Sequence, residues 1–372
     1  MDLSAEDNLR INVLLAQKLQ AVRIDESKMI VYALTDRGEA KVALNPNCKD
    51  EKYIKQVKSV LSTHVMGSPG GYPVFLKRWT RMGQAREETL GQLLLLGEPE
   101  AVVAAVHAKG LSDELAERAW WAMPSSENAR RMLEKDAVVQ GKTGKVLAEF
   151  LLEFLPFEED QRDMIESVRL VLQPGLISEA QKLSLWSKAS TRRSFYVGFL
   201  HALPDDLPED THARDDLDAL AEKLAPLVDS GNTAAALLLK LHTSAGQAFL
   251  KTVENALKKP GDQHVVESLF DAIARYFSAV KLQHCTAHDI MQICSEAEAR
   301  CEHCDADIAA LIAVIPELKN EIRAMLVLSS LSVLLLNPVF SRSDAIGTVM
   351  RKKIKHITDP VLDQIKTLQG SD

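Results

Sequence analysis

The sequence has few aromatic residues, no long apolar run and no recognisable catalytic motif. Aromatic side chains make up 5% of its 372 residues. The longest charge-free apolar run, 324–336, contains three serines and is too short to cross a bilayer as a helix. No His-Glu-x-x-His pair, nucleophile elbow or dinucleotide-binding glycine pattern occurs. The sequence therefore lacks the familiar signatures of a membrane span and of the common hydrolases and dehydrogenases.

Basic residues are fewer than acidic ones, and cysteines are few. Lys and Arg total 44 against 52 Asp and Glu, which gives a formal net charge of −8. Such a balance argues against a general nucleic-acid-binding protein. The N-terminus carries Asp2, Glu6 and Asp7 in place of a basic and apolar leader. Five cysteines in a chain of this kind indicate reduced thiols, so we expect a cytoplasmic location.

Gly141-Lys142-Thr143 matches only the end of the phosphate-binding loop motif. The first glycine of that motif would stand at position 136, which is Asp136, and its carboxylate would repel a phosphate. The preceding residues also lack the strand pattern that this motif requires. We therefore predict no nucleotide site in this segment.

Apolar residues recur at helical spacing through most of the chain. From 84 to 203, and again from 217 to 336, they fall three and four residues apart in segments separated by proline and glycine. Segments of roughly 10–15 residues predict antiparallel packing of successive helices. We expect a mainly α fold, a multi-helix antiparallel stack. A regular α-solenoid stays open as its arrangement, since no repeat of about 33 or 34 residues is visible.

The first 75 residues depart from this pattern. A helix is predicted over 4–21, followed by two β-type runs at 29–34 and 40–44. Asp36-Arg37-Gly38 between the two runs is a hairpin signal. A second helix over 50–65 completes a small α+β unit.

Two segments of loop composition predict domain boundaries. Residues 67–73 are rich in glycine and proline, and residues 204–210 are acidic and contain two prolines. The predicted domains are a small α+β unit over 1–75, a helical domain over 76–205 and a C-terminal helical domain over 211–372. Within the last domain, Asn337-Pro338 is expected to stop a helix and Asp359-Pro360 to begin the final one.

Residues 284–304 hold a concentration of side chains that commonly bind metals. They are His284, Cys285, His288, Cys294, Cys301, His303 and Cys304. One hypothesis is a metal site, an iron–sulfur site or redox thiols. The other is packing, because Cys294, Cys301 and Cys304 fall on the apolar stripe of one helix predicted within 290–315, and cysteine is often buried. Since Cys48 is isolated and completes no four-thiolate set, we favour packing and predict no metal ligand and no cofactor.

Lys77, Arg78, Trp79, Arg81 and Arg86 form a basic segment around an aromatic residue. Such a segment can bind an anionic ligand or single-stranded RNA, whose bases stack on aromatic rings. Arginine stems lying on tryptophan at a solvated face are the more ordinary interpretation. The segment is the predicted binding surface, and nucleic acid is the weaker of its candidate ligands.

Several blocks in the first 210 residues resemble one protein family. The blocks are Met1–Arg10, Leu44–Cys48, Gly67–Val74, Lys77–Gln84 and Arg118–Pro124. Together they are similar to the DsrS family, which is encoded with the reverse-acting dissimilatory sulfite reductase genes of sulfur-oxidising bacteria. The resemblance implies a cytoplasmic accessory or regulatory protein of sulfur oxidation that binds a protein partner, and it supplies no catalytic residue. The alternatives are a thiol- or metal-dependent protein that uses the cysteines of 285–304, and an RNA-binding regulator.

Overall fold

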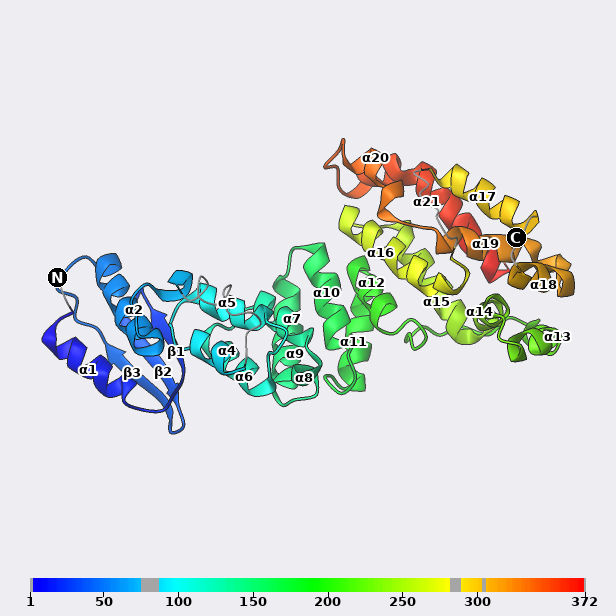
Figure 1. Ribbon diagram of the computed structural model, residues 1–372. Helices are drawn as coiled ribbons and strands as arrows, with labels where there is room; N and C mark the ends of the chain where they lie inside the picture. The colour runs from blue at the N-terminus through cyan, green and yellow to red at the C-terminus, as the bar shows by residue number, and fades with distance from the viewer. Residues whose placement is uncertain (1–2, 75–86, 282–288, 303–305, 371–372) are drawn as a thin grey trace. The chain divides into compact units, whose positions relative to one another are not determined.

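Helices joined by short loops make up most of the computed structural model (Figure 1). The structure describes residues 3–74, 87–281, 289–302 and 306–370. The chain divides into two compact units, Met1–Pro156 with Gln173–Ile177 and Phe157–Leu172 with Ser178–Asp372. All the strands among the described residues lie before residue 44. The expected mainly α fold with a small N-terminal α+β part is confirmed.

The first unit begins with α1 (Ala5–Leu15), a three-stranded sheet and α2 (Asp50–Met66). The antiparallel strands are β1 (Leu19–Asp25), β2 (Ile30–Thr35) and β3 (Gly38–Ala43), in the order β1-β2-β3. Thr35 pairs with Gly38, so the predicted hairpin is present. Gly38 has a φ of 108°, a conformation that glycine adopts without steric cost.

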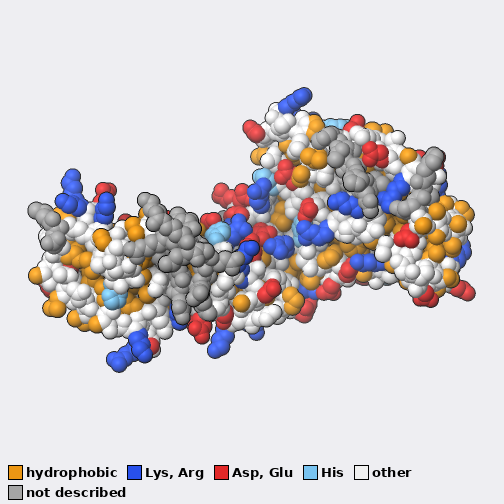
Figure 2. Space-filling view, viewed as in Figure 1, with side chains coloured by type: hydrophobic (Ala, Val, Ile, Leu, Met, Phe, Trp, Pro, Cys, Tyr) orange, Lys and Arg blue, Asp and Glu red, His pale blue; other side chains and the backbone are white. Residues whose placement is uncertain are grey.

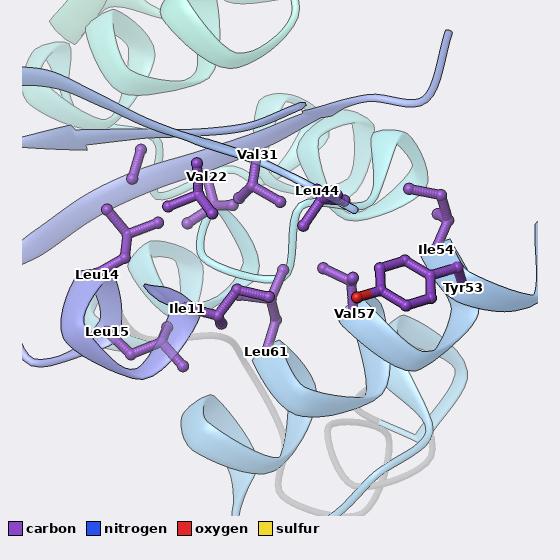
Figure 3. Packing of buried hydrophobic residues seen from close by; sticks show 12 residues of the cluster. Ile11, Leu14, Leu15, Val22, Val31, Leu44, Tyr53, Ile54, Val57 and Leu61 are labelled. Carbon is purple, nitrogen blue, oxygen red and sulfur yellow. The ribbon is translucent and has the colours of Figure 1, made fainter. Parts of the chain in front are cut away.

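A hydrophobic core fills the space between the sheet and helices α1 and α2 (Figure 3). Val22 and Val31 extend from the strands toward Ile11 of α1 and Leu61 of α2, and all four side chains are buried. The buried positions of both helices recur three and four residues apart. This spacing gives each helix one apolar face, and burial of that face against the sheet stabilises it.

The prediction of a helix over 4–21 is wrong at its C-terminal end. α1 ends at Leu15, and Leu19 begins β1. No proline or glycine marks this change, so local sequence alone does not reveal it. The backbone N–H of Val22 donates to the carbonyl of Leu94 at 2.8 Å, on the edge of β1 that faces away from β2. Pairing with residues distant in sequence thus outweighs local helix preference.

Further helices of the first unit follow the sheet. They are α4 (Glu87–Leu93), α5 (Pro99–His107), α6 (Asp113–Ala122), α7 (Ser126–Leu133), α8 (Asp136–Val139) and α9 (Thr143–Phe154). The indole N–H of Trp121 in α6 donates to Glu39 of β3 at 3.1 Å, and the guanidinium of Arg23 lies 5.0 Å from the indole ring centroid. The sheet is therefore joined directly to the helices that follow it.

All the regular secondary structure among the second unit's described residues is helical. The α-helices are α10 (Gln161–Val171), α11 (Glu179–Ala189), α12 (Arg193–Ala202), α13 (Leu217–Asp229), α14 (Thr233–His242), α15 (Ser244–Lys258), α16 (Gln263–Tyr276), α17 (Ile290–Glu302), α18 (Ala306–Val314), α19 (Lys319–Ser329), α20 (Asn337–Phe340) and α21 (Gly347–Gln369). Short 3₁₀ turns precede α19 and α20. The core of this unit includes five buried phenylalanines, Phe195, Phe199, Phe249, Phe270 and Phe277.

The acidic segment 204–210 lies inside the second unit and is held by lysines from three helices. The pairs are Asp205 with Lys240 at 2.7 Å, Asp206 with Lys182 at 2.6 Å, and Glu209 with Lys251 at 2.8 Å. The segment is therefore attached to α11, α14 and α15 instead of hanging between domains. The three-domain division at 75 and 205–211 is finer than the two compact units and stays a prediction.

Two helix boundaries predicted from prolines are wrong. Pro338 does not stop a helix, because α19 ends at Ser329 and Pro338 lies in the first turn of α20. Proline suits that position, since the first helical N–H groups have no partner within the helix.

The final helix does not begin at Pro360. α21 runs from Gly347 to Gln369 with Pro360 inside it. Its buried positions continue on both sides of the proline, at Met350, Ile354, Ile357, Val361, Ile365 and Leu368. Burial of this stripe outweighs the hydrogen bond that proline removes from the helix interior.

Candidate functional site

Two predicted sites fall wholly or partly outside the described residues. The basic segment of Lys77, Arg78, Trp79, Arg81 and Arg86 lies wholly outside them. So do His284, Cys285, His288, His303 and Cys304 from the cysteine-rich region. The binding surface predicted at 77–86 therefore stays a prediction.

Cys294 and Cys301 lie on α17. Cys301 is 6% exposed, as the packing hypothesis predicts, whereas Cys294 is half-buried at the edge of the buried stripe. The structure describes α17 as far as Glu302 and α18 from Ala306, so the single helix expected within 290–315 stays a prediction, since residues 303–305 lie outside the described residues. Burial raises the pKa of the Cys294 thiol, which keeps it protonated and poorly nucleophilic. Among the residues that the structure describes, no three His, Cys, Asp or Glu side chains are grouped to hold a metal ion.

The backbone N–H groups of the segment Gly141-Lys142-Thr143 bind a carboxylate of the same chain. The carboxylate of Asp113 accepts from the backbone N–H groups of Lys142 at 2.9 Å and Thr143 at 3.0 Å. A Cβ on Gly141 would lie only 2.1 Å from the Asp113 carboxyl carbon. The start of α9 is therefore capped by a carboxylate, where a phosphate-binding loop would leave its N–H groups for the ligand.

A cluster of charged side chains joins four helices of the second unit. We call Arg214, Asp216, His242 and Glu321 the Arg214 cluster. The guanidinium of Arg214 donates to both carboxylate oxygens of Asp216, at 3.2 and 2.9 Å, and to Glu321 at 2.8 Å. It also donates to the carbonyl of Leu368, near the end of α21, at 3.3 Å. Asp216 precedes α13 and Glu321 belongs to α19, so the guanidinium connects these two helices with α21, and Asp216 adds His242 at the end of α14.

His242 forms the pair with Asp216 that general-base catalysis often uses. Its Nδ1 lies 3.0 Å from Asp216, and a carboxylate only accepts, so the neutral ring carries its proton on Nδ1. Burial and the nearby charge of Arg214 lower the pKa of His242, although Asp216 acts in the opposite direction. The acceptor Nε2 is buried and has no hydrogen-bond partner among the described residues. A base needs contact with the proton it removes, so this geometry supports structure and not catalysis.

A groove runs along α21 and is walled on its other side by the end of α15. We call it the α21 groove, a hollow of about 290 Å³. Its cations are Lys258, Arg351, Lys352 and Lys355, its one lining carboxylate is Asp359, and its apolar residues include Leu257, Ile354 and Leu362. Lys and Arg side chains otherwise lie among Asp and Glu over the face of the second unit that Figure 2 shows. The groove is thus a local excess of positive charge in an acidic chain.

The two walls of the α21 groove are held together by backbone contacts. Arg351 donates to the carbonyl of Pro260 at 3.1 Å, and the N–H of Gly347 donates to the carbonyl of Gly261 at 2.9 Å. The basic stretch of α21 is visible in the sequence, but its opposite wall is not, since Pro260 is 91 residues from Arg351. Periodicity therefore did not reveal the groove.

Two blocks that carry the family resemblance meet in the first unit. The buried carboxylate of Asp7 accepts from the backbone N–H of Asn45 at 2.7 Å and from the hydroxyl of Tyr53. Burial and this carboxylate raise the pKa of the Tyr53 hydroxyl. Asp7 and Asn45 thus connect α1 with the loop before α2, so these parts of the blocks hold the fold together.

Comparison with known proteins found no match among family models, curated proteins or solved structures. Among the described residues no helix has the length and apolar character needed to cross a membrane. The chain's function must therefore be inferred from its charged and apolar side chains and from the resemblance of its sequence blocks.

Proposed function

We propose that this chain is a non-catalytic accessory protein that binds a protein partner, and that it acts in cytoplasmic sulfur oxidation in bacteria. The setting comes from the sequence blocks that resemble the DsrS family. The mode of action is supported by the α21 groove, where exposed cations flank an apolar floor. Concave apolar surfaces with a charged rim are typical of sites that take a segment of another protein.

The dimensions of the groove favour a protein ligand over a cofactor. Small-molecule sites usually enclose about 300–1,000 Å³, and the α21 groove, at about 290 Å³, lies just below that range. A hollow of this size accepts one or two side chains while the rest of a partner segment lies along the helix. The Arg214 cluster is already paired within the chain, and the larger hollow of about 470 Å³ beside it is lined mainly by polar and charged residues, so it lacks the apolar floor of the α21 groove.

Affinity purification from a sulfur-oxidising bacterium tests the proposal. A tagged full-length chain, expressed in cells growing on reduced sulfur, is expected to retain a sulfur-oxidation protein in near-stoichiometric amount. The double variant Lys352→Glu with Lys355→Glu should lose that protein, and Lys366→Glu, on the same helix outside the groove lining, should keep it. Retention of no such protein, or turnover of a reduced sulfur compound by the purified chain, would contradict the proposal.

Metal analysis separates this proposal from the thiol- or metal-dependent alternative. Protein purified without oxygen is expected to contain no stoichiometric iron or zinc. Stoichiometric metal that is released by Cys301→Ser and equally by Cys301→Ala would overturn the binding proposal. If Cys301 only packs, the alanine variant should be the milder of the two, because it buries no hydroxyl group.

The RNA-binding alternative makes its own prediction for the segment 77–86. Replacement of Arg78 and Arg81 by alanine should weaken RNA binding and flatten its dependence on salt. Filter binding at low salt measures this effect. Equal RNA binding by the variant and the unaltered chain would remove that alternative.

A further inference from the structure

We infer that the α21 groove binds an acidic amphipathic helix of the partner, with carboxylates on Arg351, Lys352 and Lys355 and an apolar side chain in the hollow. The inference rests on the proposed function and names the class of segment that the partner presents. Three features of the groove support it: the spacing of its residues along α21, the weak ion pairing of its cations, and the apolar residues at its floor.

The groove-lining residues of α21 form one stripe. They fall at intervals of three or four residues, with adjacent pairs at 351 and 352, 354 and 355, and 358 and 359, and they are Thr348, Arg351, Lys352, Ile354, Lys355, Thr358, Asp359 and Leu362. At about 1.5 Å per residue, the stripe from 348 to 362 is about 21 Å long. A partner helix with Asp or Glu at positions i, i+3 or i+4, and i+7 repeats this spacing. Several of its carboxylates can therefore meet groove cations at the same time.

Two groove cations keep an unneutralised charge. Arg351 donates to the carbonyl of Pro260 and to the hydroxyl of Thr348 at 2.8 Å, and both of these acceptors are neutral. The guanidinium is thus held in place without a counter-charge. Lys352 is exposed and makes no ion pair with any described residue. A partner carboxylate can bind either cation without displacing an acid of this chain.

The other two groove cations are paired only at the surface. Lys355 lies 2.8 Å from Asp359, and the two side chains are 71% and 47% exposed. Lys258 lies 2.7 Å from Glu254 and is 54% exposed. Water screens exposed ion pairs, which therefore contribute little to stability, so an approaching carboxylate can replace or share them at little cost. With both acids counted, four cations against two carboxylates leave the groove positive.

The lining of the groove favours a protein segment over RNA or a membrane. None of its lining residues is aromatic, so no ring is present on which a base could stack. Its apolar residues Leu257 and Ile354 are buried at the floor, where a projecting side chain reaches them and a flat lipid surface does not.

The acidic segment 204–210 of a second copy is a poor source of the acidic helix. It already has Asp205, Asp206 and Glu209 bound to lysines of the same unit. The segment also has no helical conformation. We therefore assign the acidic helix to a partner protein and not to this segment.

Fluorescence anisotropy with synthetic peptides tests the inference on the full-length chain. The probe is a labelled helical peptide of about 16 residues with Glu at i, i+3 and i+7 and leucines on the same face, matched to the length of the stripe. The control peptide has Gln in place of every Glu, and a second control has Ser in place of every Leu. The acidic peptide should bind at least about tenfold more tightly than either control, with affinity that falls as salt rises.

Charge-reversal variants locate the binding site. Lys352→Glu with Lys355→Glu should weaken binding of the acidic peptide by about tenfold or more, since two attractive contacts become repulsive. The matched variant Lys366→Glu with Lys353→Glu changes the net charge equally but alters no groove-lining residue, and should stay within about twofold. Circular-dichroism melting curves of both variants should match that of the unaltered chain, because all four lysines are exposed.

Four results would overturn the inference: no binding of the acidic peptide, equal binding of the Gln peptide, equal loss in the two double variants, or tighter binding of single-stranded RNA or anionic vesicles. Failure of the proposed function gives a different pattern. In that case the groove binds the acidic peptide but the cells yield no sulfur-oxidation partner. If a sulfur-oxidation partner is retained by the groove variant, the proposed function stands and this inference fails.

Discussion

The Arg214 cluster and the α21 groove use the same kinds of charged side chain in opposite ways. The Arg214 side chain is 16% exposed and Glu321 is 9% exposed, and the two form an ion pair at 2.8 Å. Along the groove, Lys352 is exposed and makes no ion pair with a described residue. A buried cation must be matched by acids of its own chain, because desolvation of an unpaired charge costs several kcal/mol. An exposed cation is hydrated, so it needs no acid of its own chain and can exchange its bound water for a carboxylate of a partner.

The acidic segment 204–210 lies between these two extremes. Its carboxylates bind lysines that are partly exposed, such as Lys240 at 40% and Lys251 at 45%. The comparison predicts a ranking. Loss of a charge should harm folding most in the Arg214 cluster and less in the acidic segment, whereas in the groove it should affect binding alone.

Arg214→Met should produce the largest loss of stability. Methionine keeps much of the side-chain volume but leaves the buried carboxylate of Glu321 without this cation and removes the contact with Leu368. Breaking a buried pair from one side typically costs about 3–5 kcal/mol. Thermal and denaturant unfolding of the full chain measure the change.

A second variant shows whether the loss comes from the orphaned charge. Arg214→Met with Glu321→Leu removes both charges of that pair, and should recover a substantial part of the stability lost by the single variant. If the double variant recovers no stability, Arg214 stabilises the fold through its packing or through its hydrogen bonds to Asp216. Lys366→Met, at an exposed position of α21, is the matched control and should change stability little.

The fold class was predictable because helical periodicity is strong where helices bury one face. The 50–65 helix has that pattern, the 29–34 and 40–44 runs have a β-type pattern with a hairpin signal between them, and the structure has all three elements. β1 was missed because its hydrogen-bond partners lie elsewhere in the sequence. Pro360 was misinterpreted as the start of a helix. The buried apolar residues on both sides of it stabilise one continuous helix, and this outweighs the hydrogen bond that proline removes. Predictions based on neighbouring residues were therefore wrong at positions where burial in the folded chain favours a different structure.

Stability should decrease as pH falls below about 6.5, the ordinary pKa of histidine. Burial, followed by the charge of Arg214, lowers the pKa of His242 in the folded chain. Burial also lowers that of His201, whose Nε2 lies 2.9 Å from the hydroxyl of Ser268. Protons therefore bind the unfolded chain first, so the stability present above this pH is lost on acidification.

Melting temperatures between about pH 7.5 and about pH 5 test the histidine effect. His242→Gln should lower the melting temperature at neutral pH, because the contact with Asp216 changes, but it should flatten the decline on acidification. Adding His201→Gln should flatten it further. An unchanged slope in the double variant would show that other groups cause the acid sensitivity.

Asp113→Ala should lower stability by about 0.5–2 kcal/mol, the usual effect of losing a helix cap. The carboxylate satisfies the N–H groups of Lys142 and Thr143 at the start of α9. Asp113→Asn keeps an acceptor oxygen and should be the milder change. Thermal unfolding measures both variants, and equal losses would show that the negative charge of Asp113 matters more than its hydrogen bonds.

The candidate site was less predictable than the fold because it combines distant parts of the chain. The stretch Arg351 to Lys355 is basic in any arrangement, but Lys258 and Pro260 become its opposite wall only through folding. The cysteine hypothesis could be formulated from spacing alone, and the burial of Cys301 agrees with packing. The spacing of residues along one helix can be read from the sequence. A groove between two helices also depends on how those helices pack against each other, which the spacing does not give.

The smallest expected effect is that of Glu209→Gln in the acidic segment. Glutamine keeps the size and one acceptor oxygen but removes the charge that faces Lys251, whose pKa is raised chiefly by its hydrogen bond to Glu209. Because Lys251 is 45% exposed, screening by water limits the loss to about 0–1 kcal/mol. The difference from the unaltered chain should shrink further at high salt. Glu317→Gln, which removes the pair with Lys223 at a more exposed site, where the two side chains are 52% and 54% exposed, provides the baseline. A loss of several kcal/mol for Glu209→Gln would mean that the acidic segment stabilises the fold as strongly as the Arg214 cluster does. In that case the degree of burial would not explain which charged side chains stabilise the fold.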